Sequence, residues 1–119
     1  MKVFAVDVPM LKVAALFVLD CTYDELRAYL HRRFKVRVEP EPDTIAGRML
    51  TFERPPYRVV WARQRELPVV LHEVFHLVTR ICADKGIVIR AHNERGENDD
   101  ETAAYLFECL ARQAIRKCR

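Results

Sequence analysis

The segment that decides the fold of this 119-residue chain begins with Leu67-Pro68-Val69-Val70-Leu71-His72-Glu73-Val74-Phe75-His76. From residue 67 to 85 the apolar residues recur at helical spacing, at Leu67, Val70, Leu71, Val74, Val78 and Ile81. Pro68 suits the first turn of a helix, and Gly86 is typical of the residue that ends one. The sequence therefore predicts a helix over 67–85. Because it is apolar around most of its circumference, we expect the domain to enclose it, with the histidines pointing into the protein or into a cleft.

His72, Glu73 and His76 form the pattern H-E-x-x-H within this helix. Two imidazoles four residues apart project from one helix face, near enough to bind one ion of the Zn²⁺ type. Glu73 lies about 100° around the helix, where its carboxylate could reach a water on the metal. The alternative is a pair of core histidines bonded to the backbone, with a solvated Glu73. We favour the metal site, because burying these three groups without partners would cost several kcal/mol.

A catalytic zinc site usually takes three protein ligands, so a third donor must lie elsewhere in the chain. The extended metzincin pattern H-E-x-x-H-x-x-G-x-x-H is excluded, because Thr79 and Cys82 stand at its glycine and its last histidine. A glutamate from a following helix is the other common solution. The acidic candidates are Glu94, Glu97, Asp99, Asp100, Glu101 and Glu108.

The spacing of apolar residues predicts that this following helix spans about 101–117, with an aspartate just before it as N-cap. Glu101, Tyr105 and Glu108 form one stripe along it. We expect Glu101 to be the third ligand, and we keep Glu108 and Asp100 in reserve. The alternative is an acidic loop that only caps the helix, since carboxylates are favourable at a helix start.

These motifs resemble the small gluzincin-type zinc peptidases, the minigluzincins, and the short zincin-like proteins encoded by phages. The resemblance covers about the C-terminal half, through Trp61 and residues 67–76, 85–87 and 100–106. It implies that residues 1–119 form a single zincin-like metallopeptidase domain, in which His72, His76 and Glu101 bind zinc and Glu73 is the general base. The chain departs from the larger gluzincins at Tyr105, where an aspartate that orients a histidine is often found.

The remaining elements predict an α+β fold. Strands are expected over residues 2–8, 13–19, 47–52 and 57–63. The second of these runs could equally form a buried helical turn. Thr22 and Glu25 form a capping box, which predicts a helix over about 23–34. We expect a twisted, mostly antiparallel sheet packed against the His72 helix, together with the C-terminal helix that carries the third ligand.

Two expectations concern the sheet itself. By the resemblance, residues 47–53 would be an edge strand that holds an extended peptide beside the metal. Trp61 could line the cleft, but a large aromatic residue on a strand is more often part of the core, and we expect it there.

Composition and charge exclude several classes of protein. Half of the residues are apolar, 31 % are charged and the net charge is +3, which is typical of a globular domain. The basic residues are spread along the chain, without the aromatic interleaving that single-stranded nucleic-acid binders use, so we expect no nucleic-acid partner. The apolar run over 10–19 is too short to cross a bilayer, so no membrane partner is expected either. The four cysteines lack the paired spacing of disulfides, which favours the cytoplasm, or a host cytoplasm for a phage protein.

The leading hypothesis is hydrolysis of a peptide bond in a peptide or protein substrate, with Zn²⁺ on the three ligands above and its water activated by Glu73. Tyr105 or His92 could donate to the oxyanion, although a core tyrosine and a surface histidine are the simpler interpretations. One alternative is a non-catalytic metal-binding module, such as a phage accessory or assembly protein, which the small size favours. Another is an autoinhibited proenzyme, in which other parts of the chain occupy the open position of the metal. The substrate, the native metal and the oligomeric state stay open.

Overall fold

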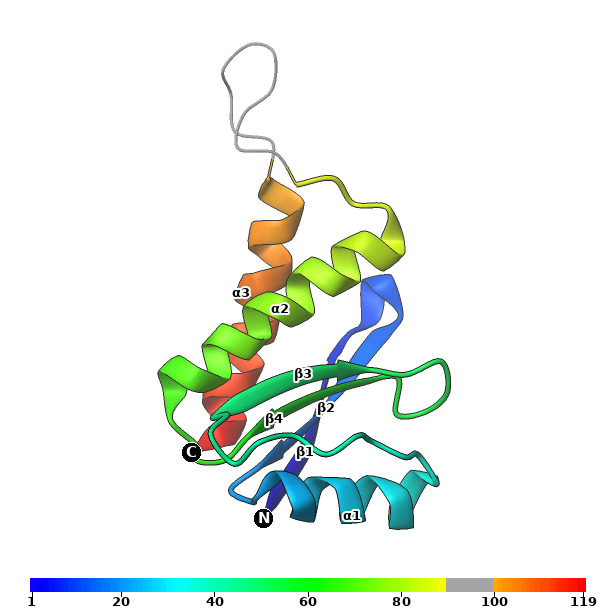
Figure 1. Cartoon of the computed structure of the whole chain (residues 1–119). Coiled ribbons are helices and arrows are strands. Elements are labelled where there is room, and N and C mark those ends of the chain that lie inside the picture. The colour runs from blue at the N-terminus through cyan, green and yellow to red at the C-terminus, as the bar shows by residue number, and fades with distance from the viewer. Residues whose placement is uncertain (90–99) are drawn as a thin grey trace.

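The middle layer of the structure is a four-stranded mixed sheet (Figure 1). The computed structural model describes residues 1–89 and 100–119, and its strands are β1 (Lys2–Val8), β2 (Val13–Leu19), β3 (Gly47–Thr51) and β4 (Arg58–Ala62). Their order is β1-β2-β4-β3, so β3 is an edge strand. The outer pairs β1·β2 and β3·β4 are antiparallel, whereas the central pair β2·β4 is parallel.

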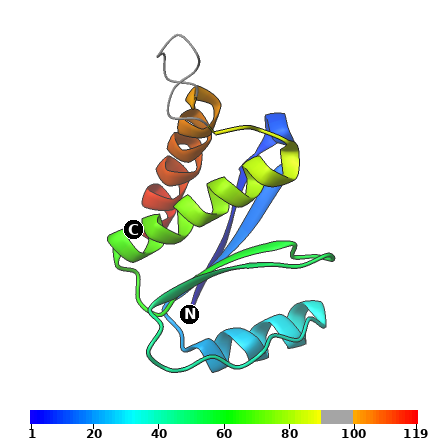
Figure 2. The same ribbon diagram turned by 45° about the horizontal axis from the view of Figure 1, so that its top comes forward.

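Helices cover both faces of this sheet (Figures 1 and 2). Helix α1 (Tyr23–Phe34) packs on one face, and helices α2 (Leu67–Lys85) and α3 (Glu101–Cys118) pack on the other. A short 3₁₀ helix, η1 (Pro9–Leu11), joins β1 to β2. Each face of the sheet therefore contributes to a separate apolar core.

Alternation along β4 explains the two cores. Val59 and Trp61 pack with the residues of α1, whereas Val60 and Ala62 pack with those of α2. Trp61 is fully buried, and its indole N–H donates to the carbonyl oxygen of Cys21 at 3.1 Å. The prediction that Trp61 belongs to the core is confirmed, and the ring lies on the sheet face opposite α2.

Local sequence signals set the ends of the helices. The Thr22 hydroxyl accepts a hydrogen bond from the Glu25 N–H at 3.1 Å, and the Glu25 carboxylate accepts one from the Thr22 N–H at 3.0 Å. This capping box begins α1 where the sequence predicts it. Gly86 ends α2 in the left-handed region with a φ of 69°. Asp100 precedes α3, but its side chain makes no capping hydrogen bond.

The predicted α+β class is confirmed. Residues 13–19 form a strand and not a helical turn. The sheet is mostly antiparallel, as expected, since two of its three strand pairs are antiparallel; β4 is parallel to β2. Among the helices within the described residues, none has the length and apolarity needed to cross a membrane.

Candidate metal centre

Helix α2 buries one side against the sheet and leaves its histidine side open. Its inward residues, Val70, Val74, Leu77, Val78 and Ile81, belong to the core shared with α3. In contrast, 67 % of the His72 side chain and 58 % of Phe75 are exposed. The prediction that the domain encloses this helix is therefore wrong on this side, because a sheet and one neighbouring helix cover only part of its circumference. The histidines face an open cleft.

His72 and His76 bring two ring nitrogens together. Their Nε2 atoms lie 3.1 Å apart, and their ring centroids lie 4.8 Å apart. A tetrahedral zinc ion with Zn–N bonds of about 2.0–2.1 Å places two nitrogen ligands about 3.3 Å apart. The donor set and its spacing therefore fit one shared metal ion. Without an ion, the same distance allows one ring N–H to donate to the other ring.

Glu73 is the one charged residue that the fold buries among the residues described, with only 6 % exposed. Its Oε1 lies 4.0 Å from His72 Nε2. Burial raises the pKa of the Glu73 carboxyl, while the neighbouring charges of His72, His76 and Arg48 oppose this shift. The alternative of a solvated Glu73 is therefore wrong. A carboxylate with a raised pKa beside two imidazoles is a suitable proton acceptor.

Gly47 allows the edge strand β3 to lie close to Glu73. A Cβ atom built on Gly47 would lie 3.0 Å from Val69 Cγ1, 3.1 Å from Glu73 Cγ and 3.2 Å from Glu73 Oε1. Ordinary contacts between carbon atoms are longer, about 3.5–4.0 Å. The strand can approach the helix this closely because residue 47 has no side chain.

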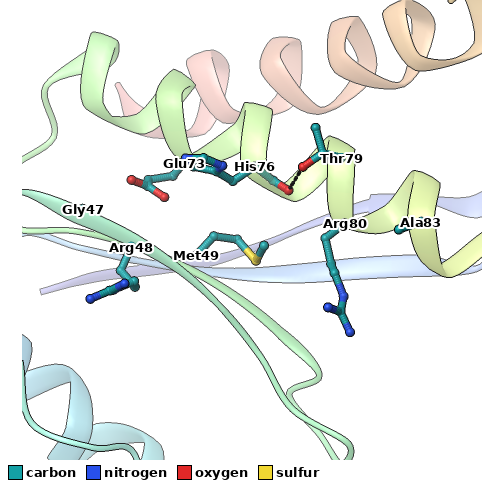
Figure 3. Close-up of a pocket in the computed structure, with 8 residues that line it drawn as sticks. All are labelled: Gly47, Arg48, Met49, Glu73, His76, Thr79, Arg80 and Ala83. Atoms are coloured by element: carbon teal, nitrogen blue, oxygen red, sulfur yellow. Dashed lines mark hydrogen bonds between the residues drawn. The ribbon is translucent and has the colours of Figure 1, made fainter. Parts of the chain in front are cut away.

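Two adjoining cavities flank this contact and form one cleft between β3 and α2. The larger, of about 510 Å³, is lined by Gly47, Arg48, Met49, Glu73, His76, Thr79, Arg80 and Ala83 (Figure 3). The smaller, of about 410 Å³, is lined by Ile45, Ala46, Gly47, Pro68, Val69, His72 and Glu73. Because Gly47 and Glu73 line both cavities, the carboxylate lies midway along the cleft, with one histidine toward each end.

Glu101, the predicted third ligand, is not among the residues that line the two cavities. Glu101 is the exposed first residue of α3, and Glu108 is exposed and paired with Arg112. Asp100 lines a different, mostly apolar cavity between α2 and α3. Within residues 1–89 and 100–119, no third His, Cys, Asp or Glu joins the two imidazoles in a group that could hold a metal ion. The identity of the third ligand therefore stays a prediction.

The two predicted oxyanion donors have different outcomes. Tyr105 is 67 % exposed, so the alternative of a core tyrosine is wrong, while its catalytic role stays a prediction. His92 lies outside the described residues, as do the acidic candidates Glu94, Glu97 and Asp99.

Sequence reasoning missed two residues of the cleft. Gly47 had a signal, since a glycine in a strand often marks a close approach of another part of the chain. Arg80 stands four residues after His76, so helical spacing alone places it on the same side of α2. The resemblance places residues 47–53 beside the metal, but spacing alone does not show that Gly47 contacts Glu73 or that Arg80 lines the same cleft.

Comparison of the chain with protein-family models, with curated proteins and with solved structures gives no match. The argument for function therefore rests on the geometry of the cleft.

Proposed function

We propose that this protein is a zinc-dependent peptide hydrolase whose α+β domain is related to the small gluzincins. In this proposal His72, His76 and Glu101 bind the zinc ion, with Glu108 or Asp100 in reserve for the third position. The observation that supports it is the pair of imidazole nitrogens 3.1 Å apart beside a buried carboxylate. Folding alone does not explain this arrangement, because taking a carboxylate out of water lowers stability.

The chemistry assigns each residue a part. A bound zinc ion would lower the pKa of a water molecule and polarise the carbonyl of the scissile bond. Glu73 accepts the proton of the attacking water and then donates it to the leaving amine. Its burial supports both steps, because a raised pKa brings the carboxylate closer to the working pH. Tyr105 and His92 are the proposed donors to the developing oxyanion.

The edge strand β3 offers a place for an extended substrate. Arg63 N–H donates to the Ala46 carbonyl oxygen at 2.9 Å, which fixes the even-numbered residues of the strand as those bonded to β4. The odd-numbered residues Gly47 and Met49 therefore direct their backbone N–H and C=O groups away from β4, to the free edge of the sheet. A peptide added there in antiparallel register would place its backbone along the cleft, beside Glu73.

The test begins with the metal. Wild-type protein loaded with zinc and dialysed should retain about one ion per chain. We expect His76→Ala and Glu101→Ala to lose it and Glu108→Ala to keep it, and circular dichroism should confirm that each variant is folded. Glu73→Gln should keep zinc but lose turnover of a fluorogenic peptide library.

Other outcomes separate the competing hypotheses. Full turnover by zinc-loaded Glu73→Gln, or a folded wild type that binds no zinc, would refute the proposal. Zinc with four protein ligands and no turnover would support the non-catalytic module instead. Self-cleavage that Glu73→Gln abolishes would indicate the autoinhibited proenzyme.

A further inference from the structure

Two arginines share one carboxylate at the end of the cleft beyond His76. Arg80 Nε lies 3.2 Å from Asp84 Oδ1, and Arg58 Nη2 lies 3.0 Å from Asp84 Oδ2. Arg80 lines the larger cavity together with His76, and 51 % of its side chain is exposed. In Figure 3 its guanidinium extends from α2 toward the side on which β3 lies.

The cluster has more donors and more positive charge than its own carboxylate can match. Each oxygen of Asp84 is already engaged by one guanidinium. A guanidinium carries five N–H donors, and Arg58 Nε is buried without a hydrogen-bond partner in the part of the chain that the structure describes. Among these three side chains one positive charge therefore remains in excess, and the Arg80 side chain is half exposed.

The position of Arg80 along α2 indicates which residue of a bound peptide would lie opposite it. Arg80 follows His76 by four residues, which is about 6 Å along the helix axis at 1.5 Å per residue. An extended peptide advances about 3.3 Å per residue, so Arg80 faces a position about two residues from the bond beside His76 and Glu73. At the start of β3, Gly47 lies beside Glu73, in the first half of α2. At the end of β3, Thr51 pairs with Arg58, which contacts Asp84 near the end of α2. The strand β3 and the helix α2 therefore run in the same direction. A peptide antiparallel to β3 therefore has its N-terminal side at Arg80.

We propose that Arg80 is a specificity-determining residue that binds an aspartate or glutamate side chain about two residues before the cleaved bond. This inference rests on the proposed hydrolysis for the position of the cut, but not for the binding of the acidic side chain. Arg58 and Asp84 hold the Arg80 guanidinium in place, and the excess charge favours a carboxylate over an amide of the same shape.

The experiment uses the whole chain loaded with zinc. A ten-residue peptide library is digested, and the cut sites are read by mass spectrometry. Aspartate and glutamate should exceed asparagine and glutamine about fivefold at the second position before the cut, the effect of one partly exposed ion pair. Arg80→Gln should abolish this preference. Arg112→Gln is the matched control, because Arg112 also pairs with an acidic residue on its own helix, Glu108, but does not line the cleft.

Binding is measured separately from cleavage. A labelled alanine-based peptide with one glutamate, and the same peptide with glutamine, are titrated into Glu73→Gln and into Glu73→Gln/Arg80→Gln. Acid-selective binding that depends on Arg80, without any cleavage by wild type, would support the inference while the proposed hydrolysis fails. Cleavage without acid preference, a preference that survives Arg80→Gln, or one on the C-terminal side of the cut would overturn the inference. Neither binding nor cleavage would overturn both.

Discussion

Replacing Gly47 with alanine should separate the geometry of the site from the stability of the fold. The new methyl group would lie 3.0 Å from Val69 Cγ1 and 3.1 Å from Glu73 Cγ. Reaching ordinary contact distances requires a movement of about 0.5 Å, either of β3 or of the two side chains. Overpacking of this kind typically costs about 1–3 kcal/mol. Urea denaturation of Gly47→Ala should show a loss within this range.

The same movement should lower activity. Glu73 contacts the site of the new methyl group directly, so the proposed base is among the groups that must shift. A misplacement of 1 Å can cost about 100-fold in rate, so a shift of half that size predicts a loss of about tenfold in kcat/KM. Zinc content should not change, because the three heavy atoms nearest to that methyl group belong to Val69 and Glu73 and not to the histidines.

Gly86→Ala is the matched control for this prediction. Gly86 has a φ of 69°, and within residues 1–89 and 100–119 no atom other than those of its chain neighbours and its own helix backbone lies within 4 Å of the position of its missing Cβ. Alanine there should cost about 1 kcal/mol through backbone strain, with no effect on kcat/KM. The reasoning fails if Gly47→Ala retains full activity, or if both variants lose activity in proportion to their loss of stability.

Three further predictions concern the buried carboxylate, the first helix and the opposite face of the sheet. Because burial raises the pKa of Glu73, the folded protein binds this proton more tightly than the unfolded chain does, and stability falls as pH rises above the usual value of 4.5. In urea denaturation, metal-free Glu73→Gln should therefore match wild type near pH 3 and have a higher free energy of unfolding than wild type at pH 8; equal stability at pH 8 would contradict this. Hydrogen bonds from Thr22 lower the pKa of Glu25, so the stability that its charge contributes is present above pH 4.5 and is lost as pH falls through the lower folded-state pKa. The melting temperature of Glu25→Gln should accordingly vary less than that of wild type below pH 5, and an unchanged acid profile would count against the capping box. Trp61→Phe should lower the free energy of unfolding by about 2 kcal/mol, because it leaves a void and removes the hydrogen bond to the Cys21 carbonyl. Its zinc content should stay the same, and loss of zinc would show that the two faces of the sheet are coupled.

Much of the fold could be predicted because its elements carry local signals. The capping box of Thr22 and Glu25 begins α1, and Gly86 ends α2, at the positions expected from sequence. The pairing of His72 with His76 also follows from local geometry, since residues four apart share a helix face. Such signals involve only residues close together in the sequence, so they can be recognised without knowing how distant segments pack.

The remaining features depend on contacts between distant segments. The burial of Glu73 follows from β3 being the edge strand next to α2, and strand order is not encoded in periodicity. The exposure of Phe75 shows the same limit, because an apolar residue on a helix predicts a covered face without saying what covers it. The parallel pairing of β2 with β4 likewise depends on the path of the chain.

The close spacing of the H-E-x-x-H pattern has a structural consequence. Each step along a helix turns about 100°, so consecutive residues enter different surroundings. Val74 lies in the core, Glu73 lies against the edge strand, and His72 opens to the cleft. Here Glu73 is buried beside strand β3, which has no side chain at the point of contact, Gly47. The buried carboxylate therefore depends on the pairing of a glycine in β3 with this helix as well as on the pentapeptide itself.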